Sequence, residues 1–478
     1  MFNMLKRTKI IATMGPATSN IQILEKMIIN GVNVFRLNFS HGNNTEHLKL
    51  IKMLFYLRRK TNCNIGILGD LQGPKIRISK FFKHKVFLKK NSIFTLDYSL
   101  KNKHGNEHKV GFNYKNLYKD VSIGDTLLLD DGKISLEVKF IRPYKIFTKV
   151  ITGGLLLNNK GINKLGGGLS AQSLTSKDKQ DIIFSSKMQL DYLAVSFPKS
   201  YKDINIVRNL VNAYRAKIKI IAKIERAEVV NNSVVMNKII ASSDAVMVAR
   251  GDLGVEICNS ELAIAQKKII KNSMKLNKVI ITATQMMESM IVEPNPTRAE
   301  VMDISNAILD GTDAVMLSAE TASGKYPLET VFQMNKICIG TEKIFKQKFF
   351  KAILKKEKDI NETISSSAIY IANNIKYVSA VATISESENA FLISSRTFSK
   401  TPIFSFSNNK KVLNYISLYK SIVPIYLKKK YYKVHLEKKV IKILLKKKFV
   451  KKRDLIVIFK SGFGLKEDQR FSIKILKV

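Results

Sequence analysis

Short apolar runs rich in β-branched residues alternate with segments of helical spacing along most of the chain. This alternation is typical of βα units arranged around a parallel sheet. Eight such units predict a closed (β/α)8 barrel, the TIM barrel of the α/β class. The runs expected to form its strands are residues 9–13, 32–39, 65–70, 192–196, 219–224, 245–249, 279–284 and 314–317.

Two stretches fall outside this pattern. Residues 74–173 carry turn signals such as Asp130–Gly132 between two alternating runs, which predicts a β-hairpin. We interpret this stretch as an inserted small β-barrel domain, a lid. Without this insert, residues 1–73 and 174–346 remain, and together they have about the 250 residues of a typical barrel. Residues 347–478 contain one helical segment and three apolar runs, which predict a C-terminal α/β domain.

The composition is basic but still that of a folded protein. The 478 residues include 81 Lys and Arg and 38 Asp and Glu, which gives a net charge of +43. Hydrophobic residues make up 45% of the chain, which excludes a disordered polyelectrolyte. The lysines are spread along the chain. We therefore interpret them as solvated surface, expect no specific nucleic-acid partner, and predict an amphipathic helix with a lysine face within the densest block, 428–453.

Nothing in the sequence predicts a membrane or disulfide-stabilised protein. No apolar run approaches the ~18 residues of a membrane span. No CxxC spacing occurs, so we expect a reducing, cytoplasmic location. The three cysteines are Cys63, Cys258 and Cys338.

Polar side chains follow nearly every expected strand at its C-terminal end, where barrels of this type carry their chemistry. A lysine and a glutamate that point inward from one strand are costly to bury unless each has a partner or a ligand. The candidates are Arg36, Asn38 and Ser40 on the second strand, Asp70, Ser196, Lys223 with Glu225, Arg250 to Asp252, and Thr284.

Glu225 and Asp252 follow adjacent strands, so their carboxylates could share one hard cation such as Mg²⁺. The alternative is that they form salt bridges with Lys223 and Arg250. Gly251 lets the backbone approach an anion closely, and a small carboxylate would fit there.

Three familiar motifs are absent or misleading. No Walker loop occurs. Gly166, Gly168 and Ala171 imitate a dinucleotide-binding fingerprint, but no βαβ unit surrounds them. His104 and His108 have zinc-site spacing, yet the intervening Gly and Asn disfavour the required helix, so we expect a surface loop.

With these residues in place, the chain resembles the pyruvate kinases from Thr8 to about Tyr426. The resemblance implies a barrel with a β-barrel lid and a C-terminal domain, the three regions expected above. Its motifs are 8–18 (TKIIATMGPAT), 32–42 (VNVFRLNFSHG), 68–78 (LGDLQGPKIRI), 221–226 (IAKIER), 246–257 (VMVARGDLGVEI), 281–290 (ITATQMMESM), 296–301 (PTRAEV) and 310–325 (DGTDAVMLSAETASGK).

The resemblance implies Mg²⁺-dependent phosphoryl transfer from phosphoenolpyruvate to ADP, giving pyruvate and ATP, in a homotetramer whose lid closes on the nucleotide. It implies metal binding by Glu225 and Asp252, and catalysis by Lys223, Arg36 and Thr284. It further implies that Arg36, Gly251, Asp252, Thr284 and Ser196 bind the substrate, and that Asn38, Ser40, His41, Arg77 and Lys160 bind the nucleotide.

Many members of the family require K⁺ and read Asp-Thr-Lys-Gly-Pro-Glu where this chain has Asp70 to Lys75. The ammonium of Lys75 supplies the charge that K⁺ would bring, so we expect activity without K⁺. The monovalent-cation pocket that the resemblance implies consists of Asn38, Ser40, Asp70 and Leu71.

A second departure lies in the phosphate-binding turn of the C-terminal domain. Glu388 stands where the family has glycine, and Ala390 stands where it has a hydroxyl residue. We expect activation by sugar phosphates to be weak or lost.

Two other functions stay open on the sequence. A basic polyanion-binding protein without phosphotransfer activity would account for the charge. A Schiff-base aldolase also places a lysine on a barrel strand, but the nearby acids would keep Lys223 protonated rather than nucleophilic.

Overall fold

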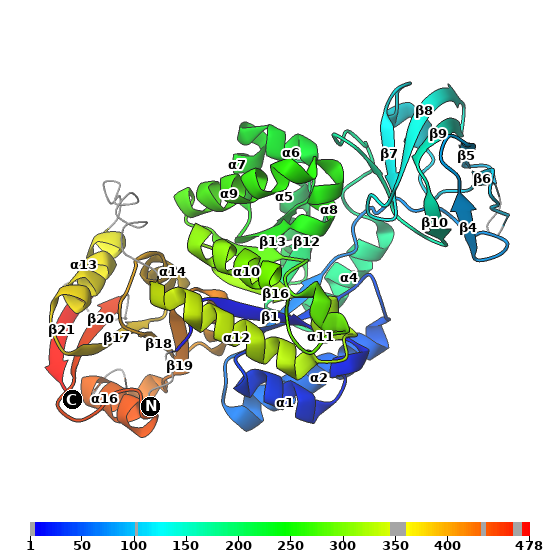
Figure 1. The fold of residues 1–478 in the computed structure, drawn as a ribbon. Coiled ribbons are helices and arrows are strands. Elements are labelled where there is room, and N and C mark those ends of the chain that lie inside the picture. Colours follow the sequence, from blue (N-terminus) through cyan, green and yellow to red (C-terminus); the bar gives the residue numbers. More distant parts are fainter. Residues whose placement is uncertain (1–4, 101–103, 345–359, 432–435, 462–470) are drawn as a thin grey trace.

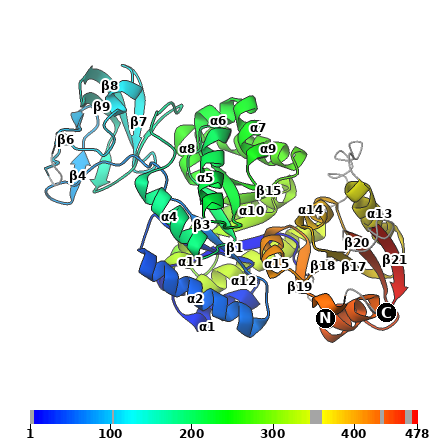
Figure 2. The same ribbon diagram turned by 180° about the vertical axis from the view of Figure 1, so that it is seen from behind.

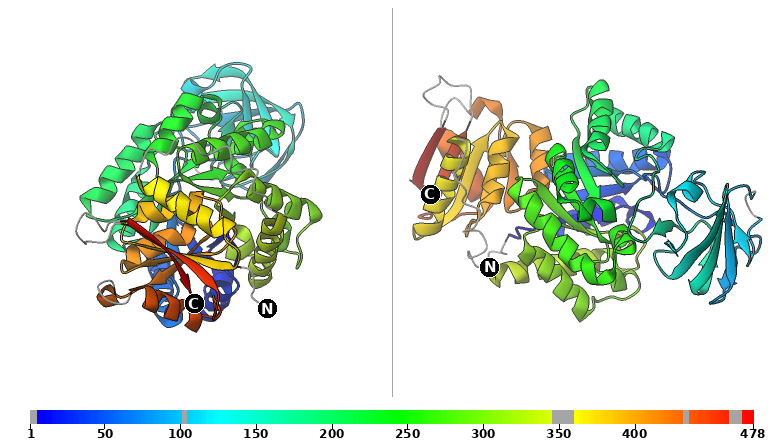
Figure 3. Two further views of the ribbon diagram at one scale, coloured as in Figure 1. Left: turned by 90° about the vertical axis from the view of Figure 1, so that its left-hand side faces the viewer. Right: turned by 90° about the horizontal axis from the view of Figure 1, so that it is seen from above.

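The computed structural model describes residues 5–100, 104–344, 360–431, 436–461 and 471–478. The chain forms three parts in a row, with the barrel between the lid at one end and the C-terminal domain at the other (Figures 1 and 3).

The eight expected runs form the strands of one closed parallel barrel, which confirms this part of the prediction. The order is β1-β16-β15-β14-β13-β12-β3-β2, and β1 pairs with both β2 and β16. Four strands, β2, β3, β12 and β15, are shorter by one to three residues than the runs that predicted them. The strands are β1 (Lys9–Thr13), β2 (Val34–Asn38), β3 (Gly66–Asp70), β12 (Tyr192–Val195), β13 (Lys219–Ile224), β14 (Ala245–Ala249), β15 (Val279–Ala283) and β16 (Ala314–Leu317).

Helices surround this barrel because successive residues of each strand point to opposite sides. On β1, Ile10 and Ala12 pack in the apolar core that includes the helices, whereas Ile11 belongs to a second core that includes the C-terminal domain. No described helix is long and apolar enough to cross a membrane. The helices are α1 (Ile21–Ile29), α2 (Asn44–Thr61), α4 (Ser176–Lys187), α5 (Tyr201–Ala213), α6 (Ala227–Asn231), α7 (Ser233–Ser242), α8 (Arg250–Glu256), α9 (Asn259–Lys275), α10 (Arg298–Asp310), α11 (Ala319–Ala322) and α12 (Pro327–Ile344).

The lid is the β-rich insert that the turn signals predicted. Asp130 and Asp131 have left-handed φ angles of 51° and 55° and join β7 to β8 as the expected hairpin. The strands of the lid form a six-stranded and a two-stranded sheet. The second sheet arises because β10 diverges from β9 after Gly153 and pairs with β4. The elements are β4 (Lys85–Leu88), β5 (Ile93–Asp97), β6 (Lys109–Val110), α3 (Leu117–Asp120), β7 (Thr126–Leu129), β8 (Ile134–Arg142), β9 (Lys145–Thr152), β10 (Gly154–Leu157) and β11 (Ile162–Lys164).

One buried aspartate ties together the two chain segments that connect the lid to the barrel. Asp178, in the first turn of α4, accepts a hydrogen bond from Gly73 N (3.0 Å) through Oδ1. Its Oδ2 accepts from Thr175 N (2.8 Å) and from the Thr175 hydroxyl (2.6 Å). The outgoing and returning segments of the lid therefore meet at one side chain.

The C-terminal domain is a five-stranded sheet of order β19-β18-β17-β20-β21, parallel except for β21. The boundary expected at residue 347 lies outside the described residues. Helix α16 has the expected amphipathic pattern but is shorter than the block 428–453, of which residues 432–435 are not described. The elements are α13 (Ile360–Asn374), β17 (Val378–Ser385), α14 (Glu388–Arg396), β18 (Ile403–Ser407), α15 (Lys410–Tyr415), β19 (Ile422–Tyr426), α16 (Leu436–Lys446), β20 (Leu455–Ser461) and β21 (Phe471–Lys477).

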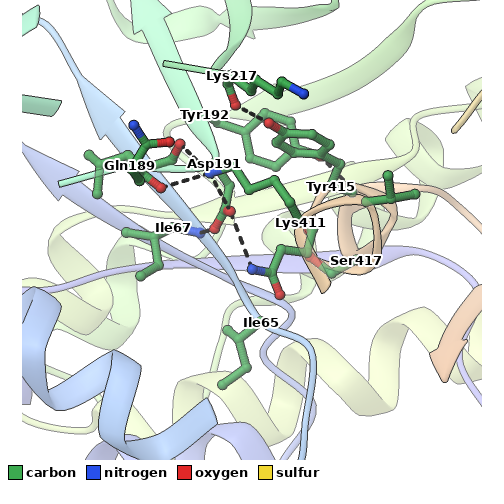
Figure 4. A network of polar contacts seen from close by, with 12 residues as sticks. Ile65, Ile67, Gln189, Asp191, Tyr192, Lys217, Lys411, Tyr415 and Ser417 are labelled. Atoms are coloured by element: carbon green, nitrogen blue, oxygen red, sulfur yellow. Dashed lines mark hydrogen bonds and ion pairs between the residues drawn. The ribbon is translucent and has the colours of Figure 1, made fainter. Parts of the chain in front are cut away.

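A polar network joins this domain to the N-terminal ends of the barrel strands (Figures 2 and 4). Its centre is Asp191, which is 0% exposed and precedes β12. Asp191 accepts hydrogen bonds from Ile67 N (2.9 Å) and Arg58 within the barrel, and from Lys411 Nζ (3.1 Å) and Asn414 of α15. Since a buried carboxylate needs such partners, the network fixes α15 against the foot of the barrel.

Lys9 is buried in the same interface. It opens β1, is 3% exposed, and donates a hydrogen bond from Nζ to Ile422 O (2.5 Å) of β19. Burial disfavours the charged form and lowers the pKa of Lys9 from 10.5 to about 7. Between these two values the unfolded chain binds one proton more than the folded chain at this residue. The contribution of Lys9 to stability therefore rises with pH between about 7 and 10.

Replacing Lys9 with methionine is expected to remove this pH dependence. The free energy of unfolding of the wild type, relative to the variant, should increase by about 1.4 kcal/mol per pH unit from pH 7 to 9. Melting temperatures of both proteins at three pH values test this, with the exposed Lys52→Met as control. A wild-type-minus-variant difference that stays constant over this range contradicts the prediction.

Candidate active site

Four predicted residues meet at the C-terminal mouth of the barrel, around the ammonium group of Lys223. Lys223 lies near the end of β13, and its Nζ is 2.8 Å from Glu225 Oε1 and 3.4 Å from Asp70 Oδ1. It also donates a hydrogen bond to Ser196 Oγ (2.8 Å), which in turn donates to Leu71 O (2.7 Å). Adjacent strands β3, β12 and β13 thus supply one charge cluster.

Arg36 of β2 joins the same cluster from the other side. Its Nε donates to Asp70 Oδ2 (2.7 Å), and its Nη1 donates to Thr13 Oγ1 (3.1 Å) on β1. Asp70 is 1% exposed and bridges the arginine and the lysine. Thr13 is a contact that the sequence analysis missed, because threonine at a strand end carries no charge signal.

The carboxylates keep the lysine charged. Asp70, Glu225 and Asp252 surround it with negative charge. Burial alone would disfavour the ammonium, but these carboxylates outweigh it and raise the pKa of Lys223 above its ordinary value. Burial raises the pKa of Glu225, an effect that the lysine only partly offsets. A protonated lysine is unsuited to Schiff-base chemistry, which argues against the aldolase alternative.

Asp252 lies in the first turn of α8, and its Oδ1 is 2.8 Å from Lys75 Nζ. Burial opposes ionisation, but Lys75 and Lys223 lower the pKa of Asp252. The salt-bridge alternative is therefore half correct: Glu225 pairs with Lys223, whereas Asp252 pairs with Lys75 and not with Arg250. Arg250 pairs with Asp303 instead (2.6 Å).

Two carboxylate oxygens of this cluster bear on whether a divalent cation fits here. Glu225 Oε1 and Asp70 Oδ1 are buried and accept no hydrogen bond, although both face the Lys223 ammonium. Within the described residues no group of three or more His, Cys, Asp or Glu side chains could hold a metal on its own. Mg²⁺ commonly takes one or two carboxylates and completes its shell with water and substrate oxygens, so Glu225 and Asp252 fit this ion.

Thr284 follows β15 with a left-handed φ of 64°, so the strand ends at Ala283, one residue earlier than expected. The Thr284 hydroxyl accepts a hydrogen bond from Gly251 N (2.8 Å) and donates to Ala283 O (2.6 Å). For a β-branched residue this backbone conformation is a genuine outlier, at about 1–3 kcal/mol of strain. The structure therefore brings together Gly251 and Thr284, two of the predicted substrate-binding residues.

The predicted nucleotide residues divide between the barrel and the lid. Asn38 Oδ1 accepts from Ser40 N (3.2 Å) at the end of β2, and His41 is exposed. Arg77 and Lys160 lie on paired lid segments, where Ile78 N donates to Lys160 O (2.9 Å). Lys160 Nζ contacts Asp130 (2.7 Å), and Arg77 Nη1 donates to Asn159 O (2.9 Å). None of these contacts joins the barrel residues Asn38, Ser40 and His41 to the lid residues Arg77 and Lys160.

Gly73 positions the first segment of the lid beside the cluster. Its φ of 68° is left-handed, and a Cβ atom there would lie 2.7 Å from Ser196 Cβ. Only glycine meets both conditions without strain. The chain thereby passes close to Ser196 and brings Lys75 to Asp252.

The misleading motifs are outside the site, as expected. Residues 104–108 form no helix, and residues 166–171 form a loop rather than the start of a helix. This loop, which crosses from the lid to the barrel, is held to the barrel by Glu228 Oε2, which accepts from Gly168 N (2.6 Å).

The departure in the C-terminal turn has an unexpected geometry. The Glu388 carboxylate contacts Lys219 Nζ (2.8 Å) at the foot of the barrel and accepts a hydrogen bond from the Tyr419 hydroxyl. Its negative charge is thus paired across the domain interface, which the sequence alone did not indicate.

Comparison with known proteins agrees with this architecture. Residues 5–331 match the family described as "Pyruvate kinase, barrel domain", and residues 362–469 match "Pyruvate kinase, alpha/beta domain". A pyruvate kinase of Buchnera aphidicola subsp. Schizaphis graminum is 55% identical over 89% of each chain, and one of Buchnera aphidicola subsp. Baizongia pistaciae is 52% identical over 100% of each. A crystal structure of a pyruvate kinase from Cryptosporidium parvum has a TM-score of 0.91 at 30% identity, covering 99% of this chain and 96% of that one.

The fold and these relatives place the protein among the phosphotransferases built on an eight-stranded barrel. Within that class the chain belongs to the pyruvate kinase family.

Proposed function

We propose that the cluster around Lys223 transfers the phosphoryl group of phosphoenolpyruvate to ADP, giving pyruvate and ATP, the last step of glycolysis. The observation that carries the proposal is the contact of Lys223 with Glu225, Asp70 and Ser196 at one mouth of the barrel. A polyanion-binding function has no comparable support, because a lysine buried among carboxylates does not face a phosphate backbone.

Binding of phosphoenolpyruvate would use both charged ends of the substrate. The backbone N–H group of Asp252 is suited to its carboxylate. The Gly251 N–H and the Thr284 hydroxyl, which bond to each other in this structure, would turn to the same carboxylate on binding. Arg36 and Lys223 would contact its phosphoryl group, because planar guanidinium and compact ammonium donors stabilise negative charge.

Phosphoryl transfer needs charge stabilisation rather than a covalent group of the protein. As the bond between phosphorus and the enol oxygen breaks, negative charge develops on that oxygen, and the Lys223 ammonium would stabilise it. Ser196 would orient the ammonium. Mg²⁺, when bound by Glu225 and Asp252, would neutralise the phosphoryl oxygens and orient them toward ADP.

The nucleotide would lie between the barrel and the lid. Asn38, Ser40 and His41 would contact it from the barrel, and Arg77 and Lys160 would pair with its phosphates from the lid. The enolate would then take a proton at C3, and Thr284 would serve as the relay for it. A homotetramer and a cytoplasmic location complete the proposal. The cytoplasmic location is proposed because the three cysteines form no disulfide, as is usual in a reducing compartment.

A coupled assay tests this function. Pyruvate formed from phosphoenolpyruvate, ADP and Mg²⁺ is reduced by an added dehydrogenase, and the loss of NADH is followed. No pyruvate above background, together with salt-dependent binding of nucleic acid, would favour the polyanion-binding alternative instead.

Activity is expected to be equal, within about twofold, in potassium and in tetramethylammonium buffers, because Lys75 supplies a fixed positive charge. Its ammonium lies 2.8 Å from Asp252 and 3.7 Å from Asp131. Lys75→Ala should make activity depend on K⁺, since the carboxylates then lack this cation. A many-fold loss of wild-type activity without K⁺ contradicts the prediction.

Sugar phosphates are expected to leave the half-saturation concentration for phosphoenolpyruvate unchanged. Glu388 places a carboxylate in the turn that would bind the phosphate, and Ala390 supplies no hydroxyl donor. Initial rates over a range of phosphoenolpyruvate, with and without a sugar phosphate, measure this. A clear drop in half-saturation would show that the turn still binds the effector.

A further inference from the structure

The strained conformation of Thr284 needs an explanation in its surroundings. Thr284 and Gln285 both have left-handed φ angles, 64° and 53°, directly after β15. Such strained conformations persist only where contacts with neighbouring groups hold them in place, and they concentrate at functional sites. The two residues make a sharp turn that directs the Thr284 hydroxyl at Gly251 N.

The guanidinium of Arg250 holds this turn. Its Nη2 donates to Thr284 O (2.6 Å) and Gln285 O (3.0 Å), and its Nε donates to Thr284 O (3.1 Å). The Arg250 side chain is only 6% exposed. The planar guanidinium carries several N–H donors in fixed directions, so it can bond two successive carbonyl groups at once. The ammonium of a lysine lacks this fixed geometry.

Asp303 in turn holds Arg250. Asp303 lies on α10, and its Oδ2 is 2.6 Å from Arg250 Nη1. This contact supplies a counter-charge for the buried guanidinium and fixes its rotation. The chain of contacts runs from Asp303 through Arg250 to the backbone of Thr284, and none of the three residues is adjacent in the sequence.

We propose that Arg250 is a positioning residue for the proton transfer that completes the reaction, and that Asp303 orients it. This inference rests on the proposed function above. In this step the C3 carbon of the enolate of pyruvate gains one proton, which comes from solvent through the Thr284 hydroxyl, while the negatively charged C2 oxygen becomes the ketone oxygen of pyruvate. No electrons are gained or lost. Arg250 touches no reacting atom and acts through the geometry of Thr284.

The test separates proton transfer from phosphoryl transfer. Exchange of the pyruvate methyl protons with D₂O, in the presence of Mg²⁺ and ATP, is followed by proton NMR. ATP formation from phosphoenolpyruvate and ADP is followed in a single turnover. Arg250→Lys should slow the exchange by about tenfold or more and ATP formation by less than about threefold, since a small misplacement of a relay is costly.

Two further variants complete the design. Asp303→Asn removes the counter-charge at nearly constant shape and should slow the exchange in the same direction, so it carries the test if Arg250→Lys does not fold. Arg58→Lys is the matched control. Arg58 also donates to a backbone carbonyl, Ile65 O (2.8 Å), and to a buried aspartate, but at the opposite end of the barrel. It should leave the ratio of the two rates unchanged.

Exchange within twofold of wild type in both Arg250→Lys and Asp303→Asn overturns the inference. So does an equal loss of exchange and ATP formation, or an equal change of their ratio in Arg58→Lys, because each indicates a merely structural role. A wild-type protein that forms no ATP overturns the proposed function, and this inference with it. An active wild type with unaltered variants overturns this inference alone.

Discussion

Replacing Lys223 with alanine is expected to lower the turnover number for pyruvate formation by about a thousandfold or more. Its ammonium contacts Glu225, Asp70 and Ser196 together, and it is held protonated by the surrounding carboxylates. Alanine removes the charge that would stabilise the enolate oxygen. The coupled assay with saturating substrates measures the loss.

The matched control lies on the same strand. Lys219 begins β13, at the opposite end from Lys223, and faces the C-terminal domain. Lys219→Ala should retain turnover within a few-fold, because its ammonium is far from the barrel mouth. If Lys223→Ala retains more than a tenth of wild-type turnover, the proposed role of this lysine is wrong.

Glu225→Gln is expected to reduce turnover by about a hundredfold or more and to raise the Mg²⁺ concentration needed for half-maximal activity. Glutamine has the shape of glutamate, and its oxygen can still accept the hydrogen bond from Phe197 N (2.7 Å), so the fold should persist. The lost charge would both weaken the metal site and leave Lys223 with one counter-charge fewer. Titrating activity with Mg²⁺ separates these effects.

Glu256→Gln is the control for this change. Glu256 is also buried and accepts one backbone hydrogen bond, from Ala227 N (2.9 Å), and burial raises its pKa to about 7. It is not one of the proposed metal ligands, so its Mg²⁺ titration should match that of the wild type. Identical titrations for Glu225→Gln and the wild type would remove Glu225 from the metal site.

The sequence was informative where a local pattern determines the structure. The apolar runs predicted all eight barrel strands, because buried strands of a parallel sheet are nearly continuous in Val, Ile and Leu. The period of two also predicted that Lys223 and Glu225 share a face, and their ion pair confirms it. The Asp130–Gly132 turn was predicted equally well.

Contacts between distant segments could not be predicted in this way. The pairing of Lys75 with Asp252 joins residues from the lid connection and from α8, and no periodicity relates them. The pairing of Arg250 with Asp303, and that of Glu388 with Lys219, depend on how helices pack on the barrel. The left-handed turn at Thr284 contradicts the preference of a β-branched residue, so a propensity argument extends the strand by one residue too many.

The attachment of both lid segments to Asp178 limits how the lid can travel. With Gly73 and Thr175 bound to one carboxylate, the two crossings are tied together at the start of α4, so that a movement of one would draw the other with it. A swing about that point carries Arg77 and Lys160 along one arc as a pair, with their spacing preserved by the backbone pairing of their segments. The phosphates of a nucleotide would thus be gripped by both side chains at once, rather than by one after the other.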